Sequence, residues 1–280
     1  MTVTISGSGL TIPAINAVAR GEKVRLSDDP AVLARIEGSR RALRQRIARG
    51  EPIYGVTTLF GGMSDRSVGP EQLSDMQRLA IWHLKSATGP RLPAADVRAA
   101  MLLRANALMK GASGVRLALI ERYVLFLNED VVPHVYQRGS IGASGDLVPL
   151  SYIAGAVLGL DRSFKVDFRG EVLDALTALE RLGLEPIALE PKEGLALNNG
   201  TSASTAVAAN AVGRAIELTA LTLGIHALYA QALLATSQSF APFIHDCKPH
   251  PGQVRVAAEM ARLIAGSRLI RDESDGERSH

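Results

Sequence analysis

Apolar residues recur every three or four positions along much of the chain, which is the spacing of one face of a helix. Two such faces, on consecutive predicted helices, consist of Val97, Met101, Ala105 and Leu108, and of Leu117, Ile120, Val124 and Leu127. Another helix is predicted from Asp29-Pro30 to Gly50, because a capping side chain precedes a proline in the first turn. A long apolar helix is predicted from about Ser202 to Ala235. The pattern therefore predicts a mainly α fold.

Strand-like alternation is rare by comparison. It is clearest from Phe164 to Val172, where a small solvated hairpin is predicted around Arg169-Gly170. Glycine-rich loops interrupt the predicted helices at 51–69, 139–145 and 191–201.

Composition agrees with packed helices and argues against two classes of partner. Hydrophobic residues make up 47% of the chain and aromatic residues only 4%, so the core must be filled by aliphatic side chains. The net charge of +3 is scattered, which predicts no nucleic-acid surface. The segment 218–235 holds no formal charge and is long enough to cross a bilayer. Its polar residues and the lack of flanking belts favour instead a central helix buried by other helices, so no membrane partner is expected.

The N-terminal sequence has no basic region followed by an apolar one, so we expect no signal peptide. The single Cys247 excludes an internal disulfide framework and fits a reducing compartment. A cytoplasmic location is the expectation.

The tripeptide Ala143-Ser144-Gly145 offers unusual chemistry. In a tight turn the amide nitrogen of Gly145 can approach the carbonyl carbon of Ala143, because glycine has no Cβ. Attack and loss of two waters, one from the Ser144 hydroxyl, give a methylidene-imidazolone ring, which is a strong electrophile. An isolated Ala-Ser-Gly more often forms a plain turn, and the chain holds a second one, Ala112-Ser113-Gly114, that no acid follows.

Four segments in a fixed order remove this ambiguity. They are Ile53-Tyr-Gly-Val-Thr-Thr58, Gly142-Ala-Ser-Gly-Asp-Leu-Val-Pro-Leu150, Asn198-Asn-Gly-Thr-Ser202 and Lys248-Pro-His-Pro-Gly-Gln253. Together they resemble the histidine, phenylalanine and tyrosine ammonia-lyases and the related aminomutases. The likeness is closest to the bacterial phenylalanine and tyrosine lyases, through 96–104 and 164–168.

The resemblance implies a role for each matching residue. Ala143, Ser144 and Gly145 would form 4-methylidene-imidazole-5-one autocatalytically, with Asp146 assisting closure. Tyr54 would be the catalytic base, beside Gly55 in the substrate site, and Asn199 would bind the substrate or the ring. From the residues alone, Tyr54 could equally be an ordinary loop tyrosine and Asn199 a helix cap. Neither a metal nor a dissociable cofactor is implied.

The pair His83-Leu84 bears on the choice of substrate. In the resembling family this pair faces the substrate's ring, and His-Leu is typical of tyrosine lyases. An imidazole can hydrogen-bond a phenol hydroxyl, and a site built for that bond rejects a substrate that lacks it. The expected reaction is the non-oxidative conversion of tyrosine to 4-coumarate and ammonia. The alternatives are a phenylalanine lyase, an aminomutase, or a His83 that serves another partner on its helix.

Two departures from the family stand out. Asn198 occupies a position where an aliphatic residue is usual. Family members are also roughly twice as long, and their second half supplies another catalytic tyrosine and the arginine that clamps the substrate carboxylate. The resemblance implies an N-terminal domain over 1–200 and the start of a helical bundle over 201–280, in a homotetramer if the bundle is completed. A non-catalytic fragment or one half of a two-chain enzyme is the rival, and the chain alone is expected to turn over tyrosine poorly or not at all.

Overall fold

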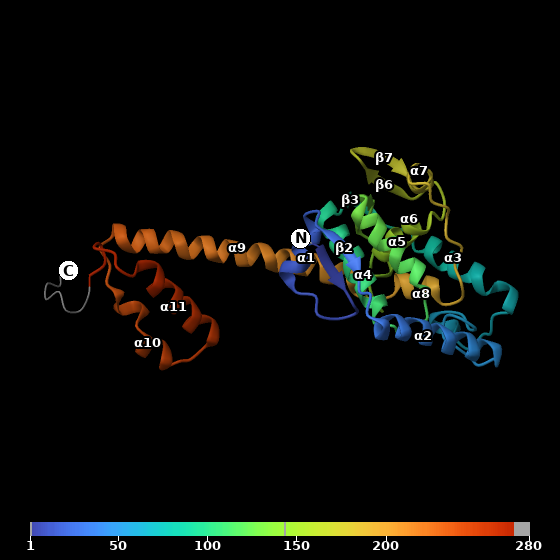
Figure 1. Cartoon of the computed structure of the whole chain (residues 1–280), viewed down its shortest axis with the longest axis horizontal. Helices are drawn as coiled ribbons and strands as arrows, with labels where there is room; N and C mark the ends of the chain where they lie inside the picture. Colours follow the sequence, from blue (N-terminus) through green and yellow to red (C-terminus); the bar gives the residue numbers. More distant parts are fainter. Residues whose placement is uncertain (1, 143, 272–280) are drawn as a thin grey trace. The chain divides into compact units, whose positions relative to one another are not determined.

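The computed structural model describes residues 2–142 and 144–271, so Ala143 lies outside the described residues. The chain folds into two compact units, 1–211 and 212–280 (Figure 1). The boundary falls inside the longest helix, α9 (Ser202–Ala232). Helices dominate both units, which confirms the predicted mainly α class.

The first unit contains the helices that hold the predicted site. They are α1 (Ile12–Ala19), α2 (Pro30–Ala48), α3 (Leu73–His83), α4 (Ala94–Met109), α5 (Leu117–Asn128), α6 (Leu147–Leu158), α7 (Ala175–Arg181), α8 (Glu193–Asn198) and the beginning of α9. Short 3-10 turns η1 (Gly61–Met63) and η2 (Pro70–Gln72) lie between α2 and α3. The helix predicted from Asp29-Pro30 forms as expected, because the Asp29 carboxylate accepts a hydrogen bond from the amide of Ala31 at 2.8 Å. The short helix α8 inside the third glycine-rich loop was not predicted.

Three small sheets complete the first unit. Strands β1 (Thr2–Ile5) and β2 (Lys23–Leu26) are parallel, and β3 (Thr88–Arg91) and β5 (Tyr136–Arg138) are antiparallel. The third sheet has the order β4 (Val131–Pro133), β6 (Lys165–Phe168) and β7 (Glu171–Asp174). The hairpin β6–β7 confirms the predicted one: Arg169 and Gly170 take φ values of 52° and 84°, as its two-residue turn requires.

The core of the first unit lies around α4 and α6. Every residue of α6 from Val148 to Leu158 is buried, and Gly155 lets the ring of Phe164 approach the helix so closely that a Cβ would collide with it. Because only Asp146 separates the tripeptide from the start of α6, this buried helix fixes one end of the glycine-rich loop 139–145.

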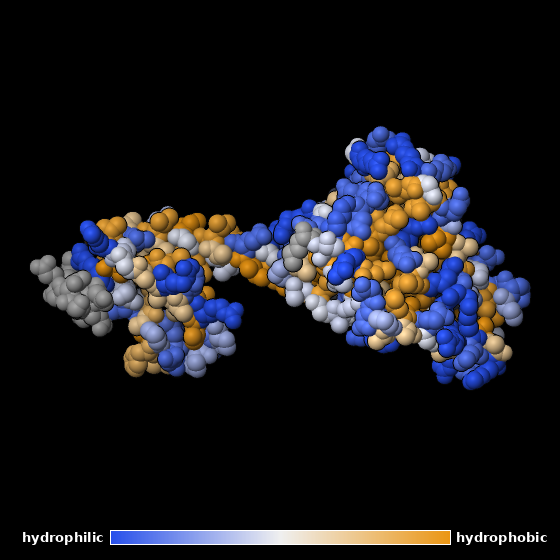
Figure 2. Space-filling model, viewed as in Figure 1, coloured by the Kyte–Doolittle hydropathy of each residue, from blue (hydrophilic) through white to orange (hydrophobic). Residues whose placement is uncertain are grey.

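The second unit has a much smaller core. Besides the rest of α9 it contains η3 (Ser237–Phe240), α10 (Pro242–Asp246) and α11 (Pro251–Ile264). Its described apolar cluster consists of buried Ala227, Met260 and Ile264, with a few half-buried neighbours. Figure 2 shows apolar side chains on the surface of α9, where Leu218, Leu221 and Leu228 are each about two-thirds exposed.

This exposure corrects one expectation. By length and composition the helical stretch Glu193–Ala232 could cross a membrane, but one such helix is a weak indication because core helices of soluble proteins meet the same criteria. We expected such a segment to be buried by other helices, whereas only 6% of its most apolar window is buried in this single chain. The described residues 2–142 and 144–271 do not supply side chains that cover this window.

Candidate active site

Gly145 packs against the turn that joins α8 to α9. Its φ is +132°, and a Cβ at this position would lie 2.8 Å from both the nitrogen and the oxygen of Gly200 and 3.0 Å from Oδ1 of Asn199. Only glycine allows this approach, because real Cβ contacts are longer and L side chains rarely adopt this backbone conformation. Gly145 and Asn199, 54 positions apart in the sequence, are therefore neighbours in the fold. The Ser144 side chain is exposed.

Asp146 fastens the same loop to α9. Its amide donates to the carbonyl of Gly200 at 2.7 Å, and its carboxylate accepts from the amide and hydroxyl of Ser204 at 2.7 and 2.9 Å. A carboxylate at the first turn of a helix satisfies an unpaired amide and interacts favourably with the helix dipole. The structure thus gives Asp146 a role in holding the loop, while its part in ring closure stays a prediction.

Asn199 ends α8. Its amide donates to the carbonyl of Leu195 at 3.0 Å, and its backbone then turns extended toward Gly200. The side-chain oxygen is left facing Gly145. The fold therefore places Asn199 beside Gly145, while its predicted binding of the substrate or the ring stays a prediction.

Tyr54 lies on a second loop, which is held by contacts different from those of the Gly145 loop. Its side chain is 53% exposed, its hydroxyl oxygen accepts from the amide of Gly61 at 3.0 Å, and its ring meets Phe60 edge to face. The next residue, Gly55, is buried with φ +64°, and a Cβ there would lie 2.6 Å from the Phe60 ring. The backbone of this loop is therefore fixed at Gly55, whereas the phenol ring of Tyr54 is half exposed to solvent.

Gln77 on α3 connects the Tyr54 loop to α8. Its side-chain amide donates to the carbonyl of Gly55 at 2.8 Å, and its side-chain oxygen accepts from the amide of Leu195 at 3.1 Å. This residue was not predicted from the sequence. A signal was present, because Gln77 lies midway between Leu73 and Ile81 on the buried face of its helix, where a polar side chain needs a partner.

His83 is the last residue of α3, and Leu84 follows it as the C-cap. His83 is exposed and meets Trp82 at a steep angle, while Leu84 packs against the core. Trp82, His83, Lys85, Asp161 and Ser163 line an open pocket of 470 Å³. Within the described residues, this pocket does not include Tyr54, Ser144 or Asn199. The predicted role of His83 toward the substrate's ring stays a prediction.

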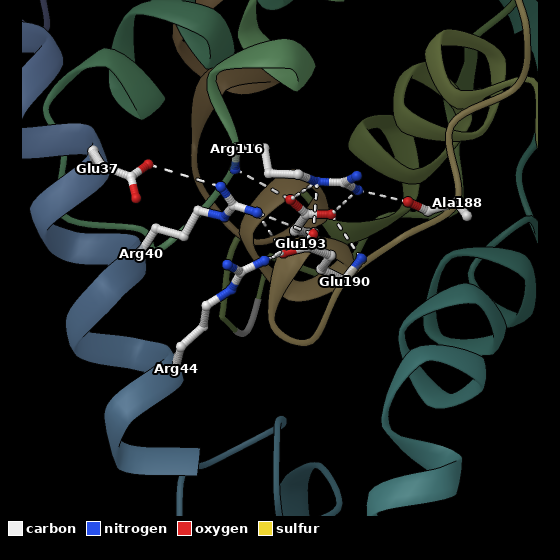
Figure 3. Close-up of polar contacts among 7 residues, drawn as sticks. All are labelled: Glu37, Arg40, Arg44, Arg116, Ala188, Glu190 and Glu193. Carbon is white, nitrogen blue, oxygen red and sulfur yellow. Dashed lines mark hydrogen bonds and ion pairs between the residues drawn. The ribbon is translucent and has the colours of Figure 1, made fainter. Parts of the chain in front are cut away.

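A buried ion pair holds the start of α8. Glu193 is 1% exposed; it accepts from the backbone amide and Nε of Arg116 at 3.1 and 2.8 Å and from Nη2 at 2.6 Å (Figure 3). It also accepts from the amide of Glu190, and Arg116 donates to the carbonyl of Ala188. The hydrogen bond to Glu193 raises the pKa of Arg116 above its ordinary value. The pair fixes α8, and with it Asn199, to the segment before α5.

Glu190 extends this cluster to α2. Nη2 of Arg40 and Nη2 of Arg44 approach its carboxylate at 3.1 and 3.2 Å (Figure 3). Partial burial pulls the pKa of Glu190 upward, but the hydrogen bond from Arg40 and the charges of Arg116, Arg40 and Arg44 outweigh it and hold the pKa below its ordinary value. Neither glutamate was predicted from the sequence.

A second buried cation lies beneath the turn between α8 and α9. Arg104 on α4 is 6% exposed, donates to the carbonyl of Ala196, and reaches so near Gly200 that a Cβ there would collide with it. Burial lowers the pKa of Arg104. Nearby in sequence, Asn198 is 2% exposed and its Oδ1 has no partner among the described residues. The departure from the family at Asn198 therefore places a polar atom in the protein interior.

Comparison with known proteins agrees with this geometry. The chain belongs to the aromatic amino acid lyase family, whose model matches residues 10–279. An aromatic ammonia-lyase from Loktanella atrilutea is 61% identical over 280 residues, which is 100% of this chain and 51% of that protein. A phenylalanine ammonia-lyase from Nostoc punctiforme is 54% identical, over 99% of this chain and 49% of that protein.

A solved structure leads to the same family. The tyrosine aminomutase from Streptomyces globisporus aligns with a TM-score of 0.91 at 33% identity, covering 98% of this chain and 51% of that one. This chain spans about half the length of the curated relatives it matches. The predicted membership of the ammonia-lyase and aminomutase family, by its N-terminal half, is thereby confirmed.

Proposed function

We propose that this chain supplies the electrophile and one base of an ammonia-lyase that eliminates ammonia from an aromatic L-amino acid, with tyrosine going to 4-coumarate. The observation that carries the proposal is the contact of Gly145 with Gly200 and with Oδ1 of Asn199. It brings the residue whose nitrogen would close the ring against the residue expected to bind the ring or the substrate.

The residues fit a ring made from Ala143, Ser144 and Gly145. Gly145 has the backbone conformation and the close packing that a side chain would forbid, and Asp146 holds the following turn by its hydrogen bonds to Ser204. The methylidene-imidazolone, once formed, supplies an electrophile that turns the substrate's amino group into a leaving group. No other side chain of the standard set supplies such an electrophile.

We assign the remaining roles to Tyr54, Asn199 and His83. Tyr54 takes the β-proton of the substrate; its oxygen is held by the amide of Gly61 and stays accessible because the side chain is half exposed. Asn199 stabilises charge that develops beside the ring. His83 selects tyrosine, because an imidazole can exchange a hydrogen bond with a phenol hydroxyl.

Two neighbouring activities have specific support. A relative 54% identical carries the name phenylalanine ammonia-lyase, which favours phenylalanine as the second candidate substrate. The matching structure of a tyrosine aminomutase favours return of ammonia to the β-carbon as the second candidate outcome.

We also propose that the exposed apolar side chains of α9 are covered in an oligomer, a homotetramer by the family resemblance. The residues concerned are Ile216, Leu218, Leu221, Ile225, Leu228 and Tyr229, and Leu233 follows directly after the helix. A continuous apolar surface of this kind marks an interaction site, because soluble monomers seldom leave one uncovered.

A hybrid protein tests the proposed reaction, with this chain replacing the matching half of the Loktanella atrilutea lyase. We expect 4-coumarate from L-tyrosine, loss of turnover in Tyr54→Phe, and in His83→Phe a fall of at least about tenfold in the preference for tyrosine over phenylalanine. The unaltered chain alone should turn tyrosine over poorly.

Two other products would assign a different substrate or reaction to the hybrid. Cinnamate formed faster than 4-coumarate by the unaltered hybrid would assign phenylalanine, and β-tyrosine would assign an aminomutase. A folded hybrid that contains the ring but yields no product from either amino acid would contradict the catalytic proposal.

A further inference from the structure

The side chain of Gln77 makes two hydrogen bonds in opposite directions. It is fully buried on α3. Its nitrogen donates to Gly55, the neighbour of Tyr54, and its oxygen accepts from Leu195, four residues before Asn199. One primary amide thus links the segment of the proposed base to the helix that presents Asn199.

The surrounding packing leaves little room for another arrangement. A Cβ on Gly194 would lie 2.5 Å from the carbonyl oxygen of Gln77, so α8 touches the backbone of α3 at this point. A Cβ on Gly55 would lie 3.0 Å from Cδ2 of Leu195, so the Tyr54 loop touches α8 directly. Three segments therefore meet around the Gln77 amide, and two of them carry a glycine at the contact.

Both backbone partners of Gln77 depend on it. Gly55 is buried, and the amide of Leu195 is in the first turn of α8, where no carbonyl of the same helix can accept from it. A buried backbone group without a hydrogen-bond partner is costly. If the side-chain amide of Gln77 is removed, the segment that can most easily expose its unpaired group to water is therefore expected to move. We expect the Tyr54 loop to move, because Tyr54, which precedes the buried Gly55, is already half exposed.

We propose that Gln77 is a positioning residue, which sets the place of Tyr54 relative to Asn199 by binding Gly55 and Leu195 at once. The inference rests on the proposed function for the roles of Tyr54 and Asn199. The link itself exists whether or not the chain turns over a substrate, so it can be tested separately.

Two substitutions of Gln77 test its two hydrogen bonds separately. Gln77→Met keeps the length of the side chain and removes both hydrogen bonds. Gln77→Glu keeps the acceptor for Leu195 and, while ionised, loses the donor for Gly55. Gln45→Glu, on the exposed face of α2, is the matched control for the added charge.

Hydrogen exchange of the full 280-residue chain, followed by peptide mass spectrometry, is the measurement. In Gln77→Met we expect about tenfold faster exchange both in 53–60 and in 195–199. In Gln77→Glu at about pH 8.5 the increase should be confined to 53–60, and at about pH 5.5 it should disappear, because a protonated carboxyl can again donate to Gly55. Gln45→Glu should change neither segment.

Wild-type protein measured at both pH values removes the contribution of other titrating groups. Those on the segments that pack against α3 are Tyr54 beside Gly55, Glu71 of η2, Tyr152 of α6, Lys192 at the N-cap of α8, and Glu193 of α8. If exchange in Gln77→Glu rises equally in both segments at both pH values, Gln77 is only a structural residue and the inference is wrong. Unchanged exchange in 53–60 of Gln77→Met would also overturn it.

The intact mass of each variant separates this inference from the proposed function. Ring formation involves Gly145 and not Gly55, so we expect every Gln77 variant to lose two waters as the wild type does. A wild-type chain that keeps its full mass would contradict the proposed function, while the exchange pattern would still decide the role of Gln77.

Discussion

The two loops that carry the proposed chemistry are held in contrasting ways. The loop of Ser144 and Gly145 is held by close packing and hydrogen bonds: Gly145 touches Gly200, the amide of Asp146 donates to Gly200, and its carboxylate accepts from Ser204. The loop of Tyr54 is fixed at Gly55, and its phenol is 53% exposed. The first arrangement suits a covalent rearrangement that needs fixed geometry, and the second leaves a side chain accessible to a substrate.

Both loops nevertheless depend on α8. Asn199 at its end faces Gly145, and Leu195 within it binds Gln77, which holds Gly55. The ion pair of Glu193 with Arg116 fixes the start of this helix. A short helix of six residues is therefore the common support of two segments that are distant in the sequence.

The largest expected effect on ring formation comes from a side chain at Gly145. Gly145→Ala forces a Cβ to within 2.8 Å of the Gly200 backbone in a conformation that favours glycine. We expect the chain to keep its full mass, because the turn can no longer close, and to lose about 1–3 kcal/mol of stability. Gly142→Ala is the control: its φ is +71° but a Cβ there meets nothing within 4 Å. Normal loss of two waters in Gly145→Ala would show that the close packing is not needed.

Removal of Glu193 tests whether α8 supports both loops. Glu193→Ala leaves Arg116 without its buried partner, so we expect a loss of about 3 kcal/mol in the free energy of unfolding, measured by denaturant titration. Hydrogen exchange should rise together in 53–60 and in the segment around Gly145. Glu37→Ala, an exposed member of the same cluster, should stay within about 0.5 kcal/mol of wild type. A change confined to one loop would mean that the loops have separate supports.

A smaller effect is expected at Asp146, within the ring loop alone. Asp146→Ala removes the two hydrogen bonds to Ser204 and should cost about 1 kcal/mol, as loss of a helix cap does. Part of the protein should then keep its full mass, with exchange in 53–60 unchanged. Ser204→Ala keeps the amide donor and should fall between this variant and wild type. Faster exchange around Tyr54 in Asp146→Ala would break the distinction between the loops.

The smallest effect concerns pH. Because the pKa of Glu190 is held below its ordinary value, its ionised form stabilises the fold above about pH 4.3. This contribution is lost as the pH falls through the lowered pKa. We expect wild type to melt at a slightly higher temperature than Glu190→Gln at pH 7 and the difference to vanish on acidification. A difference that grows on acidification would give the wrong sign for the pKa of Glu190.

Local features of the fold could be predicted from the sequence. The helices with a clear apolar face, the cap at Asp29 and the hairpin at Arg169-Gly170 depend on neighbouring residues, and they formed as predicted. The order of four motifs also identified the family. The pairing of Gly145 with Asn199 followed from that resemblance and from no local pattern.

The residues that hold the site in place could not be predicted from the sequence. Gln77 binds residues 22 positions before it and 118 after it, and Glu193 binds an arginine 77 positions away. A single sequence states which polar residues occupy apolar positions but does not say what they meet. What covers α9 could not be predicted for a related reason: an apolar helix indicates that something covers it, and not which chain does so.

The intact mass of the purified 280-residue chain tests the central claim most directly. We predict a mass lower than the encoded one by two water molecules, with the loss mapped to the peptide that contains Ala143, Ser144 and Gly145 and absent in Ser144→Ala. A folded chain that keeps its full encoded mass would contradict the account.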